Sequence, residues 1–254
     1  MDYTPPPDDS PAKRALNDMR AAIAFLTRLP INASHFDLAR ACWAFPVAGL
    51  LVGLAAGVVF ASAHYFGLPA FISALLTLLV GTILTGALHE DGLADTADGL
   101  AGSDPDRRLK IMRDSHIGAY GVLALIFSVG LRTYALAATA ETGFSVLISA
   151  AILSRGLLPA MMFTLDLASD SGLAAATGKP ERNTALLSVG LASAGTVAIL
   201  GPAAGIGALI FGMLGVGGIA LLAKHLLGGY NGDTLGAAQQ SAEIAVLLFL
   251  AASL

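Results

Sequence analysis

Four carboxylates lie within nine residues of one another in the segment HEDGLADTADGLAG, which runs from His89 to Gly102. If this segment is helical, Asp91, Asp95 and Asp98 fall at positions i, i+4 and i+7 and share one face. Like charges at this spacing repel one another, so a bound cation is the natural compensation. Clustered carboxylate oxygens are ligands that Mg²⁺ and Mn²⁺ prefer. The spacing therefore favours a divalent metal site over the alternative, a solvated acidic loop.

A second segment, RRLKIMRDSHIGAYG at residues 107–121, supplies basic groups for an anionic substrate. Lys110 and Arg113 are the candidates, and Asp114 follows them directly. Basic side chains beside an acidic metal site are the usual pairing for phosphoryl transfer, in which catalysis is mostly positioning and charge neutralisation. The alternative is that these residues only orient the chain in a membrane and contact lipid headgroups.

A third polar segment, GGYNGDTLGAAQQSAE at residues 228–243, carries Asn231 and Asp233 between glycines. This pattern is typical of a close-fitting loop that opens a helix, and helix N-termini bind anions. A helix cap at Asp233 would by itself explain part of the pattern. Both interpretations stay open at this point.

The composition indicates the elements that must position these groups. Of the 254 residues, 56% are hydrophobic and only 13% are charged, whereas soluble domains carry about 25% charged residues. Apolar runs of about 20 residues, long enough to cross a bilayer, recur along the chain. The net charge of −4 gives no electrostatic reason to expect nucleic-acid binding. Cys42 is the only cysteine, so neither a disulfide framework nor a cysteine-rich metal site is expected.

We predict an all-α fold, a polytopic integral membrane protein with about seven transmembrane helices. Residues 1–14 are polar and proline-rich, typical of a disordered lead, and residues 15–254 form a single transmembrane domain. The segment 15–31 has helical spacing of apolar residues and is either an amphipathic helix on the membrane surface or a short packing helix. The predicted spans are 44–66, 70–88, 118–140, 144–165, 185–203, 205–226 and 237–254, with a turn at Gly201-Pro202.

Lysine and arginine fall in alternate loops. They precede the first span, lie between spans two and three and between spans four and five, and close span six. The loops at 67–69 and 141–143 and the turn near 201–205 carry none. The positive-inside rule therefore places the N-terminus and every basic loop in the cytoplasm. The three polar segments then share one side of the membrane, which predicts a common site facing the cytoplasm.

Two arginines, Arg132 and Arg155, fall inside apolar runs. A charge at this depth is costly and often functional. We expect Arg132 either to reach the membrane interface or to pair with a carboxylate.

Taken in chain order, ALHEDGLADTADGLAG, IMRDSHIGAYG and GGYNGDTLGA, together with FLTRLP at 25–30 and FPVAG at 45–49, resemble the cobalamin synthase family. The resemblance covers almost the whole chain after the first fifteen residues, and three motifs at compatible spacing make it highly specific. Family members are Mg²⁺-dependent transferases of the cytoplasmic (inner) membrane. They transfer the adenosylcobinamide-phosphate unit from adenosylcobinamide-GDP to α-ribazole, or its 5′-phosphate, and release GMP in cobalamin biosynthesis.

The resemblance implies a set of roles for the residues above. Mg²⁺ would be held by Glu90, Asp91, Asp95 and Asp98, and one of these aspartates or Asp233 would accept the hydroxyl proton. The implied substrate-binding residues are His89, Lys110, Arg113, Asp114 and Asn231. The partners are the two substrates and the lipid bilayer, without nucleic acid, and a homo-oligomer is compatible with the sequence.

Two other functions stay possible. A CDP-alcohol phosphotransferase of lipid synthesis performs similar chemistry with a membrane aspartate cluster, but such enzymes have an arginine after DG-x-x-A, where this chain has DGLAD. A secondary transporter would explain glycine-interrupted spans, but its acids are expected deep in the membrane.

Overall fold

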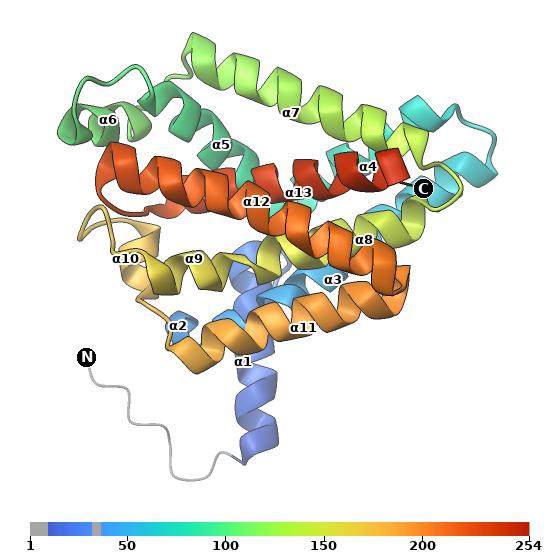
Figure 1. Cartoon of the computed structure of the whole chain (residues 1–254), viewed down its shortest axis with the longest axis horizontal. Coiled ribbons are helices and arrows are strands. Elements are labelled where there is room, and N and C mark those ends of the chain that lie inside the picture. The colour runs from blue at the N-terminus through green and yellow to red at the C-terminus, as the bar shows by residue number, and fades with distance from the viewer. Residues whose placement is uncertain (1–9, 32–36, 254) are drawn as a thin grey trace.

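The computed structural model describes residues 10–31 and 37–253, and across these ranges the chain is helical, without a β-strand (Figure 1). Six helices are long and apolar enough to span a membrane, and a bent helix pair raises this number to seven. The predicted all-α, polytopic fold is therefore confirmed. The helices are α1 (Pro11–Leu26), α2 (Leu38–Ala41), α3 (Phe45–Tyr65), α4 (Ala70–Thr85), α5 (Leu88–Gly99), α6 (Pro105–Met112), α7 (Ala119–Ala138), α8 (Gly143–Gly156), α9 (Leu158–Thr164), α10 (Leu173–Thr177), α11 (Arg182–Leu200), α12 (Pro202–Leu227) and α13 (Gly232–Ser253), with a 3₁₀ turn η1 (Cys42–Ala44).

The breaks between helices follow local sequence. Gly201 adopts φ 81°, a backbone conformation that suits glycine, and Pro202 begins α12, as the sequence predicts. Pro159 stands at the start of α9, which continues the α8 span after one intervening residue. The last span begins at Gly232, earlier than the predicted residue 237, so Asp233 lies in the first turn of α13.

The second predicted span is broken. Gly86 and Ala87 both have positive φ, 66° and 58°, and α5 leaves the direction of α4 by 91°. The predicted span over 70–88 therefore ends early, at Thr85, and the acidic segment does not continue it. The acids nevertheless lie on a regular helix, because α5 restarts at Leu88. The left-handed conformation of Ala87 costs about 1–2 kcal/mol, since its Cβ crowds the backbone.

Small residues bring the central helices α3 and α8 together. A methyl group at Gly53 would lie 2.7 Å from the Cα of Ile148, and one at Gly49 would overlap the backbone of Ala151. The glycine-rich stretch GLLVGLAAG, residues 49–57, therefore acts as the packing surface between the two helices. It places α8 in the middle of the bundle, where nearly all of its side chains are buried.

Helix α1 runs across the direction of the long helices (Figure 1). Its Asp18 is buried and accepts from Trp43 Nε1 at 3.1 Å, and it pairs with Arg40 at 2.8 Å. This contact fixes α1 to α2 and η1. Residues 11–14, which we assigned to the disordered lead, form the first turn of α1, whereas residues 1–9 lie outside the described residues.

The segments α5, α6 and α10 gather at one end of the bundle, beside the start of α13 (Figure 1). This is the end at which the polar segments were expected to meet. The bundle thus presents one polar end, and the apolar spans lie beyond it.

Cysteine labelling tests the side of the membrane on which this end lies. Ser103→Cys and Asp170→Cys are exposed positions of the polar end, and Glu141→Cys is exposed in a loop that we expect on the opposite side. The native Cys42 is fully buried and should give little background. We expect a membrane-impermeant maleimide to label the first two variants only from the cytoplasm and the third only from outside. Labelling of Ser103→Cys from outside would contradict the orientation.

Candidate active site

Helices α5 and α13 pack backbone against backbone through two glycines. A methyl group at Gly92 would lie 2.7 Å from the carbonyl oxygen of Asp233, and one at Gly236 would lie 3.1 Å from the Cα of Gly92. No larger side chain fits at this crossing without moving a helix. The contact brings the first and third polar segments, some 140 residues apart in sequence, to one place.

The Asp95 carboxylate lies within electrostatic reach of three others, those of Asp233, Asp91 and Asp98. Asp91 is exposed, and Asp95 and Asp233 are half-buried. None of these four aspartates forms a salt bridge within 4 Å to a described residue. Within residues 10–31 and 37–253, the side chains as positioned do not bring three His, Cys, Asp or Glu groups onto one metal position. The structure therefore gathers the predicted acids without closing a coordination shell.

Asp98 has a structural task. Both of its carboxylate oxygens accept backbone hydrogen bonds, from the N–H of Gly118 at 2.7 Å and of Gly121 at 2.8 Å. These amides belong to the open N-terminus of α7, where an acceptor and a negative charge are favourable. Asp98 is 7% exposed and fastens α5 to α7.

Asn231 caps α13. Its side-chain oxygen accepts from the Thr234 N–H, and the Thr234 hydroxyl accepts from the Asn231 N–H, both at 2.9 Å. The Asn231 amide also donates to Asp233 at 2.9 Å. The predicted loop that opens a helix is confirmed, and Asn231 orients the Asp233 carboxylate in addition to capping the helix.

The basic segment reaches the acids through Arg113. Its guanidinium donates to Ser169 at 2.8 Å and to Ser171 at 3.1 Å, and it lies within electrostatic reach of Asp233. Lys110 is exposed on the last turn of α6. The structure therefore brings Arg113 to the candidate site, whereas no hydrogen bond or ion pair within the described residues connects Lys110 to it.

Asp114 lies in the exposed connection after α6. It accepts from the backbone N–H and from the ring Nδ1 of His116, the latter at 2.7 Å. These hydrogen bonds lower the pKa of Asp114, and the same carboxylate raises the pKa of His116. The pair is exposed to solvent, so it contributes little to stability.

The carboxylate of Glu90 has a different set of neighbours from the one that we predicted. It accepts from Arg132 at 3.3 Å, from Gln240 at 3.2 Å and from Thr82 at 3.4 Å. These partners come from α7, α13 and α4, inside the bundle. Glu90 is therefore engaged in an ion pair and lies apart from the aspartates that follow it, which argues against its predicted role as a metal ligand.

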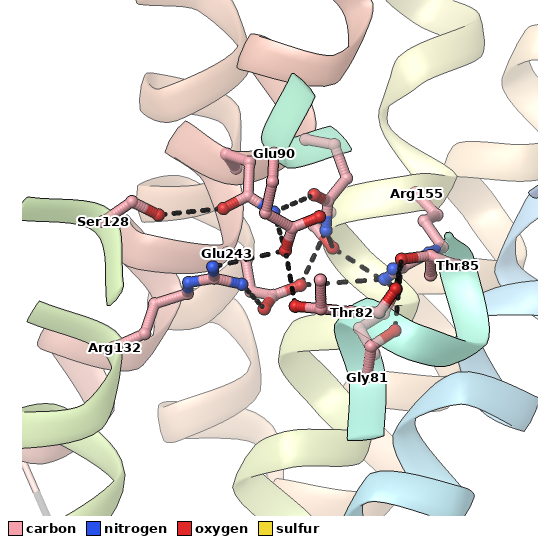
Figure 2. A network of polar contacts seen from close by, with 12 residues as sticks. Gly81, Thr82, Thr85, Glu90, Ser128, Arg132, Arg155 and Glu243 are labelled. Atoms are coloured by element: carbon pink, nitrogen blue, oxygen red, sulfur yellow. Dashed lines mark hydrogen bonds and ion pairs between the residues drawn. The ribbon is translucent and has the colours of Figure 1, made fainter. Parts of the chain in front are cut away.

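Figure 2 shows that Glu90 belongs to a larger network in which Arg132 and Arg155 converge on Glu243. Arg132 donates to Glu243 at 3.1 Å, and Arg155 lies 3.7 Å from the other oxygen of the same carboxylate. Gln239 donates to Glu243 at 2.6 Å. The expected pairing of Arg132 with a carboxylate is confirmed. Two arginines and two glutamates together carry no net charge, which is the condition for burying them among apolar helices.

Sequence reasoning missed the role of Glu243. Gln239, Gln240 and Glu243 are polar residues in an otherwise apolar last span, and the local sequence assigns them no partner. The sequence feature that could have revealed their role is the pair of intramembrane arginines, Arg132 and Arg155, which lack an acidic partner nearby in the chain. A charge in one span requires an opposite charge in another.

The side chain of His89 also has neighbours other than the aspartates. It is 2% exposed, and it lines an apolar cavity of about 40 Å³ with residues of α1, α9, α10 and α13. Its Nε2 atom has no hydrogen-bond partner within the described part of the chain. The predicted substrate-binding histidine thus lies next to the acids along the chain, and its side chain faces this apolar cavity.

Loss of one member of the network should destabilise the bundle. Arg132→Leu would leave Glu90 and Glu243 buried without their shared partner, so we expect a loss of about 3–5 kcal/mol. The measurement is thermal or denaturant unfolding of the purified protein in detergent. Arg107→Leu, at an exposed position of α6, is the matched control and should change the free energy of unfolding by less than about 0.5 kcal/mol. Equal stability of the two variants would contradict the network's importance.

Comparison with known proteins assigns the family. Residues 18–251 match the family model described as cobalamin-5-phosphate synthase. A relative from Bradyrhizobium diazoefficiens, named adenosylcobinamide-GDP ribazoletransferase, is 42% identical over 97% of both chains. A relative of the same name from Mesorhizobium japonicum is 42% identical over 95% of both chains. Another, from Allorhizobium ampelinum, is 38% identical over 94% of this chain and 98% of its own. No solved structure matches. The chain belongs to the cobalamin-5-phosphate synthase family.

Proposed function

We propose that the chain is an adenosylcobinamide-GDP ribazoletransferase of cobalamin biosynthesis. It transfers the adenosylcobinamide-phosphate unit from adenosylcobinamide-GDP to α-ribazole, or its 5′-phosphate, and releases GMP. Family membership and the names of the relatives support this assignment. The observation that carries the chemistry is the close packing of Gly92 against the backbone of Asp233, which brings Asp95 and Asp233 within electrostatic reach of each other, and Arg113 within reach of Asp233.

The reaction is a displacement at phosphorus. A ribose hydroxyl oxygen of the acceptor forms a bond to the phosphorus that carries the cobinamide. The bond from this phosphorus to the bridging oxygen breaks, and GMP leaves with the bonding electrons. We assign acceptance of the hydroxyl proton to one carboxylate oxygen of the half-buried pair Asp95 and Asp233, and the other oxygens of the pair are left for the cation proposed below. Arg113 would hold phosphate oxygens, with Lys110 contributing from α6.

We further propose that Asp91, Asp95 and Asp233 hold Mg²⁺ together with the pyrophosphate of the donor. The fit rests on the donor set, because these oxygen ligands carry excess negative charge that no salt bridge within the described residues offsets. Asp98 would contribute only through lone pairs that its two backbone hydrogen bonds leave free. When bound, Mg²⁺ would neutralise charge that develops on the phosphate oxygens.

We place the site at the cytoplasmic face of the inner membrane, as the distribution of lysine and arginine favours. The corrin donor is large and rich in amides, so a polar end of the bundle suits it. A diacyl lipid substrate would instead enter sideways between apolar helices. Neither a CDP-alcohol phosphotransferase nor a secondary transporter gains support from the family match.

Substitution of the acids tests the proposed chemistry. Asp91→Asn, Asp95→Asn and Asp233→Asn should each lower GMP release at least about 100-fold, equivalent to about 2.7 kcal/mol of barrier, without loss of the fold. The assay combines purified protein, adenosylcobinamide-GDP, α-ribazole and Mg²⁺ and is repeated without divalent cation. Asp106→Asn, an exposed acid of α6, is the control. Near-normal activity in all three variants would refute the metal site, and CMP release from CDP-diacylglycerol would refute the assignment.

The glycine crossing provides a second test. In Gly92→Ala the added methyl group meets the backbone of Asp233, so α5 and α13 must separate, and Asp95 moves away from Asp233. We expect at least a tenfold loss of turnover. Gly130→Ala introduces the same methyl group where nothing lies within 4 Å, and this variant should keep full activity. If both variants are equally active, the close contact is not needed for catalysis.

A further inference from the structure

An apolar cavity lies directly behind the first turn of α13. Its walls include Phe25 and Leu26 of α1, Phe45 of α3, and Leu158 and Met162 around α9. The cavity measures about 40 Å³. It shares Phe25, Leu88 and Leu173 with a more open cleft of about 460 Å³, which therefore adjoins it.

The cavity touches the same two helices that carry the proposed reacting groups. Gly232, Leu235 and Gly236 line it, and these residues flank Asp233 on α13. Leu88 and His89 line it from α5, immediately before the acids. A molecule that fills the cavity is therefore within one helical turn of Asp233.

The shape and chemistry of the walls favour a flat aromatic ligand. The rings of Phe25 and Phe45 are stacked, with centroids 6.0 Å apart and planes 16° from parallel. Aromatic walls of this kind bind planar rings by offset stacking and by burial of apolar surface. These two phenylalanines belong to FLTRLP and FPVAG, two of the segments that carry the family resemblance. Neither segment contributes a group to the proposed phosphoryl transfer.

One polar atom remains in this apolar space. His89 Nε2 is buried and has no hydrogen-bond partner in the described residues, and a buried polar group of this kind is costly. In the tautomer that carries hydrogen on Nε2, it donates to an acceptor. A ligand with apolar edges and one acceptor nitrogen would satisfy it.

We propose that this cavity, with the adjoining part of the cleft, binds the aromatic base of the acceptor nucleoside, and that His89 donates a hydrogen bond to the free ring nitrogen of that base. The proposal rests on the proposed function, because α-ribazole carries a dimethylbenzimidazole: two fused apolar rings with a single unsubstituted nitrogen. The base would be held between α1, α9 and α10, so that its ribose points toward Asp233. His89 is then a specificity-determining residue for the acceptor.

A pair of ligands that differ in one atom tests the role of His89. The first is α-ribazole, and the second is the matching α-riboside of 5,6-dimethylindole, in which CH replaces the free nitrogen. Titration calorimetry with the purified full chain should show about tenfold tighter binding of α-ribazole, as expected for one buried hydrogen bond. His89→Leu should lose this tenfold preference and keep its affinity for the indole riboside. His89→Gln, which retains a donor, should recover part of the preference.

Filling the cavity tests its location. Ala174 of α10 lines the cavity and is 5% exposed, whereas its neighbour Ala175 is not among the lining residues. Ala174→Leu should raise the KM for α-ribazole at least tenfold and leave the KM for adenosylcobinamide-GDP unchanged. Ala175→Leu is the matched control, which should change neither value.

The possible outcomes separate the two proposals. Equal effects of His89→Leu on the affinity for both ribosides would overturn the base site. So would an effect of Ala174→Leu on the KM for adenosylcobinamide-GDP alone. A buried water that stays bound to His89 in the presence of α-ribazole would also overturn it. Absence of GMP release by the wild-type enzyme with α-ribazole and with its 5′-phosphate would reject the proposed function. The comparison of the two ribosides by calorimetry would still decide the base site in that case.

Discussion

The arrangement of this protein depends on one constraint: the charges of two arginines and two glutamates inside the bundle must neutralise one another. Arg132 of α7 and Arg155 of α8 share Glu243 of α13, and Arg132 also holds Glu90 of α5. A charge in this setting is tolerated only when its partner is in contact with it. Four helices are therefore fixed relative to one another, among them α5 and α13, which carry the acids of the candidate site.

Neighbouring acids on α5 have different tasks because the helix has two environments. Glu90 points to the arginines inside the bundle, whereas Asp91, one residue later, is exposed at the polar end. Asp98 completes the N-terminus of α7 with both oxygens. Helix α5 is held at its first turn by the ion pair of Glu90 with Arg132. At its last turn it is held by Asp98, which caps α7. Asp95 lies between these two contacts, which together set its position relative to α7 and α13.

The sequence predicts those features that depend on local pattern. The length and hydropathy of the spans, the turn at Gly201-Pro202, the helix opened by Asn231 and the spacing of Asp91, Asp95 and Asp98 on one helical face all follow from residue types. Features that depend on a distant partner could not be predicted. Nothing near Glu90 in the chain indicates that Arg132 faces it, and nothing near Asp98 indicates that the amides of α7 occupy its oxygens. His89 could not be separated from the acids that follow it, because only the fold shows the cavity that it lines.

The break between α4 and α5 reconciles a charged site with an apolar bundle. A straight helix through residues 70–99 would carry Asp91, Asp95 and Asp98 along the axis of α4. The 91° bend instead lays α5 across the polar end, beside α6 and the start of α13. The positive φ of Ala87 costs about 1–2 kcal/mol, which is small beside the several kcal/mol that burial of an unpaired carboxylate would cost. The strained turn is therefore the less expensive solution, and it leaves Asp91 open to the phosphate-bearing substrate while Glu90 stays in the apolar interior.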